Sequence, residues 1–337
     1  MRIVVDGMGG DNAPAAIVEG AVLASEKIRE EIYLIGREEE LAAELSKYDF
    51  DEAKIKIIDA SEVIANEEAP VRAVRTKKDS SIVKGINMVK NGEAELFISA
   101  GSSGALMAGG LFILGRIPGI DRPAIASAYP ILGQGVTLLV DSGANSECKP
   151  RNLLEFAVMG SIYMDKVIGI DEPKVGLVNI GAEENKGATL TKAAFELLSK
   201  SDLNFIGNVE ARDVPLGACD VTVCDGFVGN VILKLTEGLA LSMTGEMKKK
   251  FTAGLRATVG ALILKKKLTE LKKDFDYSEY GGAPILGVKG PIVKMHGSSN
   301  ANGVMNSIIK AVPYAKEGVV TMIQRQVLNS EEIAESE

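Results

Sequence analysis

Short β-branched runs alternate with longer amphipathic segments along most of this chain, and this alternation limits the folds it can adopt. RIVVD at residues 2–6 is followed by PAAIVEGAVLASEKIREE and then by IYLIG, and similar strands recur at LFISA, GVTLLVD, VGLVNIG and DVTVCD. Apolar strands that lack polar alternation are buried on both faces, and the intervening helices cover those faces. The sequence therefore predicts an α/β fold on a predominantly parallel sheet.

Residues 96–115, LFISAGSSGALMAGGLFILG, form a run of twenty positions without a charge. The length matches a membrane-spanning helix, but the Gly and Ser residues in its middle break such a helix. We expect a strand at LFISA, a turn at GSSG and a helix over ALMAGGLFILG. The run is therefore predicted to belong to the core and not to a membrane span.

Composition and charge narrow the functional classes. Of the 337 residues, 46% are hydrophobic and 25% are charged, which is the balance of a globular protein, and no secretory leader precedes the first strand. The formal net charge of −8 argues against nonspecific nucleic-acid binding. Three cysteines are too few for a disulfide framework and indicate a reducing cytoplasm, with Cys219 and Cys224 as small core residues. A zinc site is not expected.

Six strand ends lead into loops rich in Gly, Ser and Asn. The loops cover residues 5–14, 99–110, 140–150, 179–190, 224–234 and 294–303. Where such a loop opens a helix, it presents backbone N–H groups and a partial positive charge that suit a phosphate. Because these loops follow strands of an open sheet, we expect them to gather at the carboxyl ends of the strands. Any one of them alone could be an ordinary tight turn, whereas six together favour a phosphate-bearing ligand.

Several familiar catalytic motifs are missing. The first loop lacks G-x-G-x-x-G, and neither the P-loop pattern nor a G-x-S-x-G elbow occurs in the chain. The single histidine, His296, excludes a site with several histidine ligands. We therefore expect neither a nucleotide cofactor nor a metal.

The segment at residues 240–275 stands apart from the acidic remainder of the chain. Residues 248–273 hold nine Lys or Arg against one acid, Glu270. Apolar residues recur here at helical spacing, and Gly260 is a candidate turn between two helices. Three readings stay open: a helical hairpin with a solvated lysine face, a tip that lies on anionic lipid, and a docking surface for an acidic protein. In the second reading the apolar tip is Leu255, Val259, Leu262, Ile263 and Leu264.

With these loops laid out, the sequence closely resembles the phosphate acyltransferase family of bacterial phospholipid synthesis. The segments that carry the resemblance, in order, are GMGGDNAP, SAGSSGALMAGG, VDSGAN, GLVNIGAEENKGATL, GNVEARDVP, CDGFVGNVILKLTEG and DYSEYGGAPILGVKGPIVKMHGSSN. Two positions depart from the family pattern: Gly7 stands where the family has Ala, and Ser102-Ser103 replace an Asn-Thr pair.

The resemblance implies transfer of a fatty acyl group from acyl carrier protein to inorganic phosphate, without a cofactor. The acyl phosphate would pass to a membrane glycerol-phosphate acyltransferase. It also implies a three-layer α/β/α Rossmann-like domain over residues 1–330, with two subdomains possible, like that of isocitrate and isopropylmalate dehydrogenases and of phosphotransacetylases. The hairpin at residues 240–275 is inserted in it. Such enzymes are homodimers that attach peripherally to the inner face of the cell membrane.

Residue roles follow from the same resemblance. Lys186 is the expected cation shared by phosphate and the tetrahedral oxyanion. Asn145 and Asn230 are the expected donors, and His296 donates to phosphate or orients it. Asp225 either contacts substrate or only shapes its loop. The expected phosphate- and substrate-binding positions are Gly9, Gly10, Asp11, Ser99, Gly101, Ser102, Ser103, Gly104, Asn179, Asp225, Gly226, Gly229, Ser298 and Asn300.

Three other functions fit the sequence less well. An NAD-dependent decarboxylating dehydrogenase needs a metal-binding Asp group that the sequence lacks. A phosphotransacetylase acting on acyl-CoA differs by lacking the basic hairpin. A non-catalytic membrane scaffold leaves six donor-rich loops unexplained. A second basic cluster, at residues 72–78, is either a docking point for acyl carrier protein or a solvated helix face.

Overall fold

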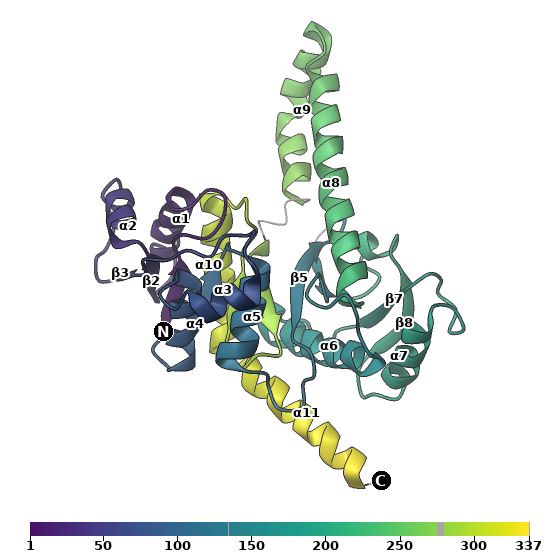
Figure 1. The fold of residues 1–337 in the computed structure, drawn as a ribbon. Helices are drawn as coiled ribbons and strands as arrows, with labels where there is room; N and C mark the ends of the chain where they lie inside the picture. Colours follow the sequence, from purple (N-terminus) through teal and green to yellow (C-terminus); the bar gives the residue numbers. More distant parts are fainter. Residues whose placement is uncertain (134, 275–279, 337) are drawn as a thin grey trace.

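The computed structural model describes residues 1–133, 135–274 and 280–336, with side chains described for residues 1–133, 135–267 and 280–327. Its centre is a single mixed sheet (Figure 1). In spatial order the strands are β3 (Ile55–Asp59), β2 (Glu31–Gly36), β1 (Arg2–Asp6), β4 (Leu96–Ser99), β11 (Ile292–Lys294), β10 (Ala283–Leu286), β5 (Ala124–Pro130), β6 (Val136–Val140), β9 (Val221–Val223), β7 (Val175–Asn179) and β8 (Phe205–Glu210).

Most neighbouring strands are parallel, which confirms the α/β prediction, but the two halves of the sheet run in opposite directions. β10 is antiparallel to both β11 and β5, and β5 is antiparallel to β6. On one side β1 to β4 and β11 are parallel, and on the other side β6 to β9 are parallel. The three antiparallel pairings in the middle therefore reverse the second half relative to the first.

Helices cover both faces because the strands alternate their apolar side chains between two cores. Ile3 and Val5 belong to one core, whereas Val4 belongs to the other. The first core is covered by α1 (Ala15–Ser25), α2 (Glu38–Leu45), α6 (Pro150–Tyr163), η2 (Met164–Ile168), α7 (Thr189–Ser199), α10 (Ala301–Lys316) and α11 (Val319–Ser336). The opposite face carries α3 (Pro70–Thr76), α4 (Ser81–Lys90), α5 (Ser103–Gly109), η1 (Gly110–Leu114), η3 (Val214–Leu216) and the start of α8 (Gly226–Phe251).

Two local predictions are confirmed. Residues 96–115 form strand β4, then a turn, then α5 and η1, and no described helix combines the length and apolar character that would let it cross a bilayer. Cys219 and Cys224 are buried core residues.

Helices α8 and α9 (Leu255–Asp274) lie side by side and project far from the body (Figure 1). The chain reverses at residues 252–254, where Gly254 has a φ of +93°. The expected turn at Gly260 is wrong, because this residue lies inside α9. The positive φ of Gly254 is a backbone conformation that glycine adopts readily and most other residues do not. Residue 275, the last of the predicted hairpin, lies outside the described residues.

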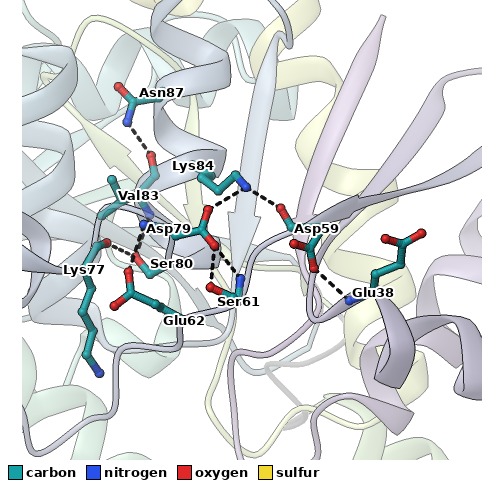
Figure 2. A network of polar contacts seen from close by, with 10 residues as sticks. All are labelled: Glu38, Asp59, Ser61, Glu62, Lys77, Asp79, Ser80, Val83, Lys84 and Asn87. Carbon is teal, nitrogen blue, oxygen red and sulfur yellow. Dashed lines mark hydrogen bonds and ion pairs between the residues drawn. The ribbon is translucent and has the colours of Figure 1, made fainter.

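A polar network fixes the segment between β3 and α4, as Figure 2 shows. The Asp79 carboxylate accepts hydrogen bonds from the backbone N–H and the hydroxyl of Ser61 and from the Lys84 ammonium, the last at 2.8 Å. Lys84 also donates to the Asp59 carbonyl, and Ser80 caps α4. This segment carries α3, whose Pro70 packs against α5 at Gly104. The network thereby fixes the segment that packs against the start of α5.

We expect Asp79→Asn to lower the urea midpoint of unfolding at pH 7. The hydrogen bonds from Lys84 and Ser61 lower the pKa of Asp79 below its usual 3.8. A lowered native pKa stabilises the fold above the unfolded-state value, and this stabilisation is lost as the pH falls below about 4. The difference between variant and parent should therefore shrink on acidification. Asp202→Asn, at an exposed position, is the control; an equal effect of both substitutions would contradict the role of the network.

Candidate active site

A cavity of about 340 Å³ lies between α5 and α8, against the central strands β10, β11 and β5. Four of the six predicted loops contribute to its wall. The lining consists of Ser103, Ile125, Ser127, Ala128, Ser142, Gly143, Asn230, Leu233, Lys234, Glu237, Gly281, Gly282, Ala283, Lys294, Met295, His296 and Gly297.

The loops after β1, β4 and β11 pack directly on one another. The Asp11 N–H donates to the Gly297 carbonyl at 2.8 Å, and the Asn12 amide donates to two carbonyls of the 294–303 loop. A Cβ on Gly9 would lie 2.6 Å from the backbone nitrogen of Gly101, and one on Gly10 would lie 2.8 Å from the Gly297 oxygen. Glycine is required at residues 9 and 10 because the three loops approach through their backbones.

Buried Asp6 organises this side from the end of β1. Its carboxylate accepts a 2.6 Å hydrogen bond from the Ser99 hydroxyl and a 3.1 Å bond from the Met8 N–H. The same hydroxyl accepts from the Gly101 N–H at 2.9 Å. Burial raises the pKa of Asp6, and the hydrogen bond from Ser99 opposes this. Asp6 and Ser99 therefore hold the 99–104 turn beneath the cavity.

Asp141 has the same role on the other side of the cavity, at the end of β6. Its carboxylate accepts from the backbone N–H groups of residues 143–145 and 125, and from the side-chain amide of Asn145 at 2.9 Å. Burial raises the pKa of Asp141, and these hydrogen bonds oppose the rise. The 141–145 turn is thus shaped by one carboxylate, and the start of α8 rests on it.

Helix α8 can approach this turn only because its first turn contains glycines. A Cβ on Gly226 would lie 2.7 Å from the Asn145 nitrogen, and one on Gly229 would lie 1.9 Å from the Asp141 carbonyl oxygen. Asp225 caps the helix by accepting from the Val228 N–H at 2.9 Å. The DGFVG motif therefore seats α8 so that Asn230 and the following turns reach the cavity.

The charged and titratable groups in the cavity wall are two lysines, one glutamate and the histidine. Lys294, the last residue of β11, donates to the Ala100 carbonyl at 3.0 Å and to the Met295 carbonyl. Lys234 donates to Glu237 at 2.7 Å, one turn further along α8. Burial lowers the pKa of Lys294 to about 8, although Asp6 and Asp11 act in the opposite direction. The cationic group of the cavity is therefore Lys294 of β11, because Lys234 of α8 is paired with Glu237.

His296 is neutral near pH 7. Burial lowers its pKa, and the nearby Glu237 carboxylate raises it by a smaller amount. The Ser298 N–H donates to Nδ1 at 3.2 Å, so the neutral ring carries its proton on Nε2. Nε2 lies 3.9 Å from a Glu237 oxygen. The ring thus presents an N–H donor at the cavity wall.

The predicted site residues differ in where they lie relative to the cavity. Ser103, Asn230 and His296 line the cavity. Others shape it from behind: Ser102, Asp225 and Asn300 cap α5, α8 and α10, and Ser298 orients His296. Both amide hydrogens of Asn145 point to protein acceptors, the Pro123 carbonyl and Asp141.

The 179–190 loop does not reach the lining. Lys186 is exposed, and the Asn179 amide donates to its carbonyl at 3.2 Å. The catalytic role of Lys186 therefore stays a prediction, and the lysines in the cavity wall are Lys234 and Lys294. Sequence reasoning missed both, together with Glu237. A signal was available, because Lys294 ends a strand directly before the MHGSSN loop and Lys234 follows Asn230 by one helical turn.

Groups of three or more His, Cys, Asp or Glu placed to hold a metal are absent from residues 1–133, 135–274 and 280–336. The donors in the cavity wall are hydroxyls, an amide, an imidazole and two lysines. Such a set of donors suits an oxyanion better than a cation.

The fold is shared with solved phosphotransacylases. A phosphotransacetylase from Streptococcus pyogenes superposes with a TM-score of 0.63 at 19% identity, covering 94% of both chains. A branched-chain phosphotransacylase from Enterococcus faecalis V583 gives a TM-score of 0.56 at 15% identity, covering 94% of this chain and 99% of that one. At these identities the likeness shows the fold.

Sequence relatives give the family. The family model described as "Fatty acid synthesis protein" matches residues 1–322. Proteins called phosphate acyltransferase from Clostridioides difficile (strain 630) and Alkaliphilus oremlandii (strain OhILAs) are 50% and 53% identical, covering 96% and 97% of this chain and of their own. The chain belongs to this family, the phosphate acyltransferases, and is an enzyme of the transferase class.

We expect Gly229→Ala to destabilise the protein by about 1–3 kcal/mol, the usual cost of overpacking, because the new methyl group collides with the Asp141 carbonyl. Thermal or urea unfolding measures the change. Gly238→Ala, on the same helix with open space around it, is the control and should stabilise by about 0.5–1 kcal/mol. Equal effects at the two positions would refute the close approach of α8.

Proposed function

We propose that this protein transfers a fatty acyl group from the thioester of acyl carrier protein to inorganic phosphate. The acyl phosphate is then used by a membrane glycerol-phosphate acyltransferase. The observation that carries the proposal is the cavity itself, where loop ends rich in hydrogen-bond donors meet two lysines and a neutral histidine. Membership of the phosphate acyltransferase family supports the same reaction.

The chemistry needs little from the protein beyond positioning and charge stabilisation. A phosphate oxygen attacks the thioester carbon, a tetrahedral oxyanion forms, and the C–S bond breaks to release the carrier thiolate, which then takes a proton from solvent. Phosphate is ionised at neutral pH and is its own nucleophile, and a thiolate with a pKa near 8.5 leaves readily. Amide, hydroxyl and ammonium donors stabilise the oxyanion. Asn230 lines the cavity and is the proposed amide donor to the oxyanion.

An apolar groove adjoins the cavity along α8 and is suited to part of the acyl chain. It is lined by Tyr129, Pro130, Leu132, Pro215, Leu233, Thr236, Glu237 and Ala240. Leu233 and Glu237 belong to both hollows. The polar reacting end and the apolar tail of one substrate could therefore occupy neighbouring parts of the same helix surface.

The purified protein should release carrier thiol from acyl-acyl carrier protein only when phosphate is present, with less activity on acyl-CoA. Lys186→Ala tests the role assigned to Lys186 by resemblance: loss of an oxyanion partner costs about a hundredfold in kcat. Lys192→Ala, at a second exposed lysine nearby, is the control. A folded Lys186→Ala enzyme with normal turnover removes Lys186 from the mechanism. Absence of phosphate-dependent release by the parent protein would refute the proposed function.

The hairpin formed by α8 and α9 supports peripheral binding at the inner face of the cell membrane. Near its tip, the side chains of Leu255, Ile263 and Leu262 are 83%, 78% and 65% exposed. Lys265–Lys267 follow directly, so apolar and cationic groups lie together on one protruding element. Apolar side chains at the acyl boundary with lysines at anionic headgroups are typical of interfacial helices. Such binding would deliver a poorly soluble acyl phosphate beside the bilayer.

A second exposed row on α8 supports a homodimer. Phe227, Val231, Leu235 and Leu239 repeat every four residues, and all four are exposed. An apolar stripe of this length on one helix face needs a partner surface, and a second copy of the chain supplies the same stripe.

We also propose that the domain has the three-layer α/β/α arrangement of isocitrate and isopropylmalate dehydrogenases.

We expect Leu262→Glu combined with Leu264→Glu to weaken binding to anionic vesicles by at least about tenfold, because each buried leucine contributes about 1.5–3 kcal/mol. Binding by the parent protein should also fall with added salt. Vesicle co-sedimentation measures both effects. Leu197→Glu combined with Leu216→Glu, at exposed positions on the body, is the matched control. Unchanged vesicle binding by the tip variant would show that the hairpin tip does not contact lipid.

A further inference from the structure

Lys294 is a largely buried cation whose charge is incompletely matched by the protein around it. Its ammonium donates to two carbonyl oxygens, those of Ala100 and Met295. In the described part of the chain no ion pair joins it to a carboxylate, although Asp6 and Asp11 lie near enough to influence it. An ammonium has three N–H donors, so two carbonyls leave one for another acceptor.

Lys294 lies in the wall of the cavity, where a ligand could accept this remaining hydrogen bond. The residue lines the cavity at the end of β11, in the same wall as Ser103 and His296. Its two carbonyl partners belong to the loops that follow β4 and β11, so these loops hold the ammonium in place. A buried cation without an ion-pair partner is costly unless an anion compensates it. The cavity is the accessible side from which such an anion can approach.

We propose that the Lys294 ammonium binds the inorganic phosphate, in a subsite completed by the Ser103 hydroxyl and the His296 Nε2–H. This inference rests on the proposed function and adds the residue that holds the nucleophile. Lys294 contacts a phosphate oxygen that does not attack, and the attacking oxygen points to the thioester carbon. Lys234 is the less suitable cation, because Glu237 already neutralises it at 2.7 Å.

The charge state of Lys294 gives this subsite a distinctive pH dependence. Burial places its pKa at about 8, while Asp6 and Asp11 favour the charged form and Lys234 disfavours it. His296 and Glu237 are the other titratable groups of the wall, and His296 is already neutral in this range. Phosphate affinity should therefore be lost as the pH rises through about 8, where the ammonium becomes a neutral amine.

Steady-state kinetics of the full-length enzyme tests the subsite, with KM measured separately for phosphate and for acyl-acyl carrier protein. We expect Lys294→Met to raise the KM for phosphate about 10- to 100-fold, the usual loss for one charge-assisted hydrogen bond, with a much smaller change for the acyl donor. Lys294→Arg should keep the phosphate KM within a few-fold and remove the alkaline rise, because guanidinium stays charged. Lys192→Met is the control.

Calorimetric titration with inorganic phosphate alone separates this inference from the proposed reaction. Phosphate binding that is lost in Lys294→Met supports the subsite even if the parent protein proves inactive with acyl carrier protein. If Lys294→Met fails to fold, the pH profiles of the parent and of Lys294→Arg decide. A phosphate KM within twofold of the parent in folded Lys294→Met, or an alkaline rise that persists in Lys294→Arg, overturns the proposal.

Discussion

The site depends on the reversal of strand direction in the middle of the sheet. β5 and β10 are antiparallel to each other and to their outer neighbours, so the two parallel halves run in opposite senses. In a fully parallel sheet the functional loops would line one edge. Here the loops after β4 and β11 come from one half, and the 141–145 turn with α8 comes from the other. They meet across the sheet face between α5 and α8, and the cavity lies there.

Buried carboxylates then fix the backbone on each side of the cavity. Asp6 holds the turn after β4 through Ser99, and Asp141 holds the turn after β6 by accepting from several N–H groups. Burial raises the pKa of both carboxyl groups, and these hydrogen bonds oppose the rise. They act on backbone shape, whereas Lys294, His296 and Asn230 lie in the wall itself. The two aspartates therefore shape the backbone, whereas the three wall residues are the candidates for contact with substrate.

Much of the fold could be predicted from sequence because its signals are local. The strand at LFISA, the break at GSSG and the helix that follows are set by apolar runs and by Gly and Ser, and all three are observed. The hairpin turn was misplaced at Gly260 because either glycine could end a helix, and only the fold shows that Gly254 takes the positive φ. For the site, Ser103, Asn230 and His296 were found through their loops. Lys234 and Lys294 stand at the ends of two of these loops, 224–234 and 294–303, but only the fold shows that they line the cavity.

The sequence alone determined the alternation of strands and helices, the loops rich in donors, the lone histidine and the basic segment. Each of these features depends only on a short stretch of the chain. The family resemblance rests on the same stretches. Only the tertiary structure decided which loops meet. It left the 179–190 loop with Lys186 outside the cavity wall and brought Lys294 beside the loop after β4, some two hundred positions earlier in the chain. The physical reason is that strand order and direction depend on long-range pairing across the sheet, which no local pattern encodes.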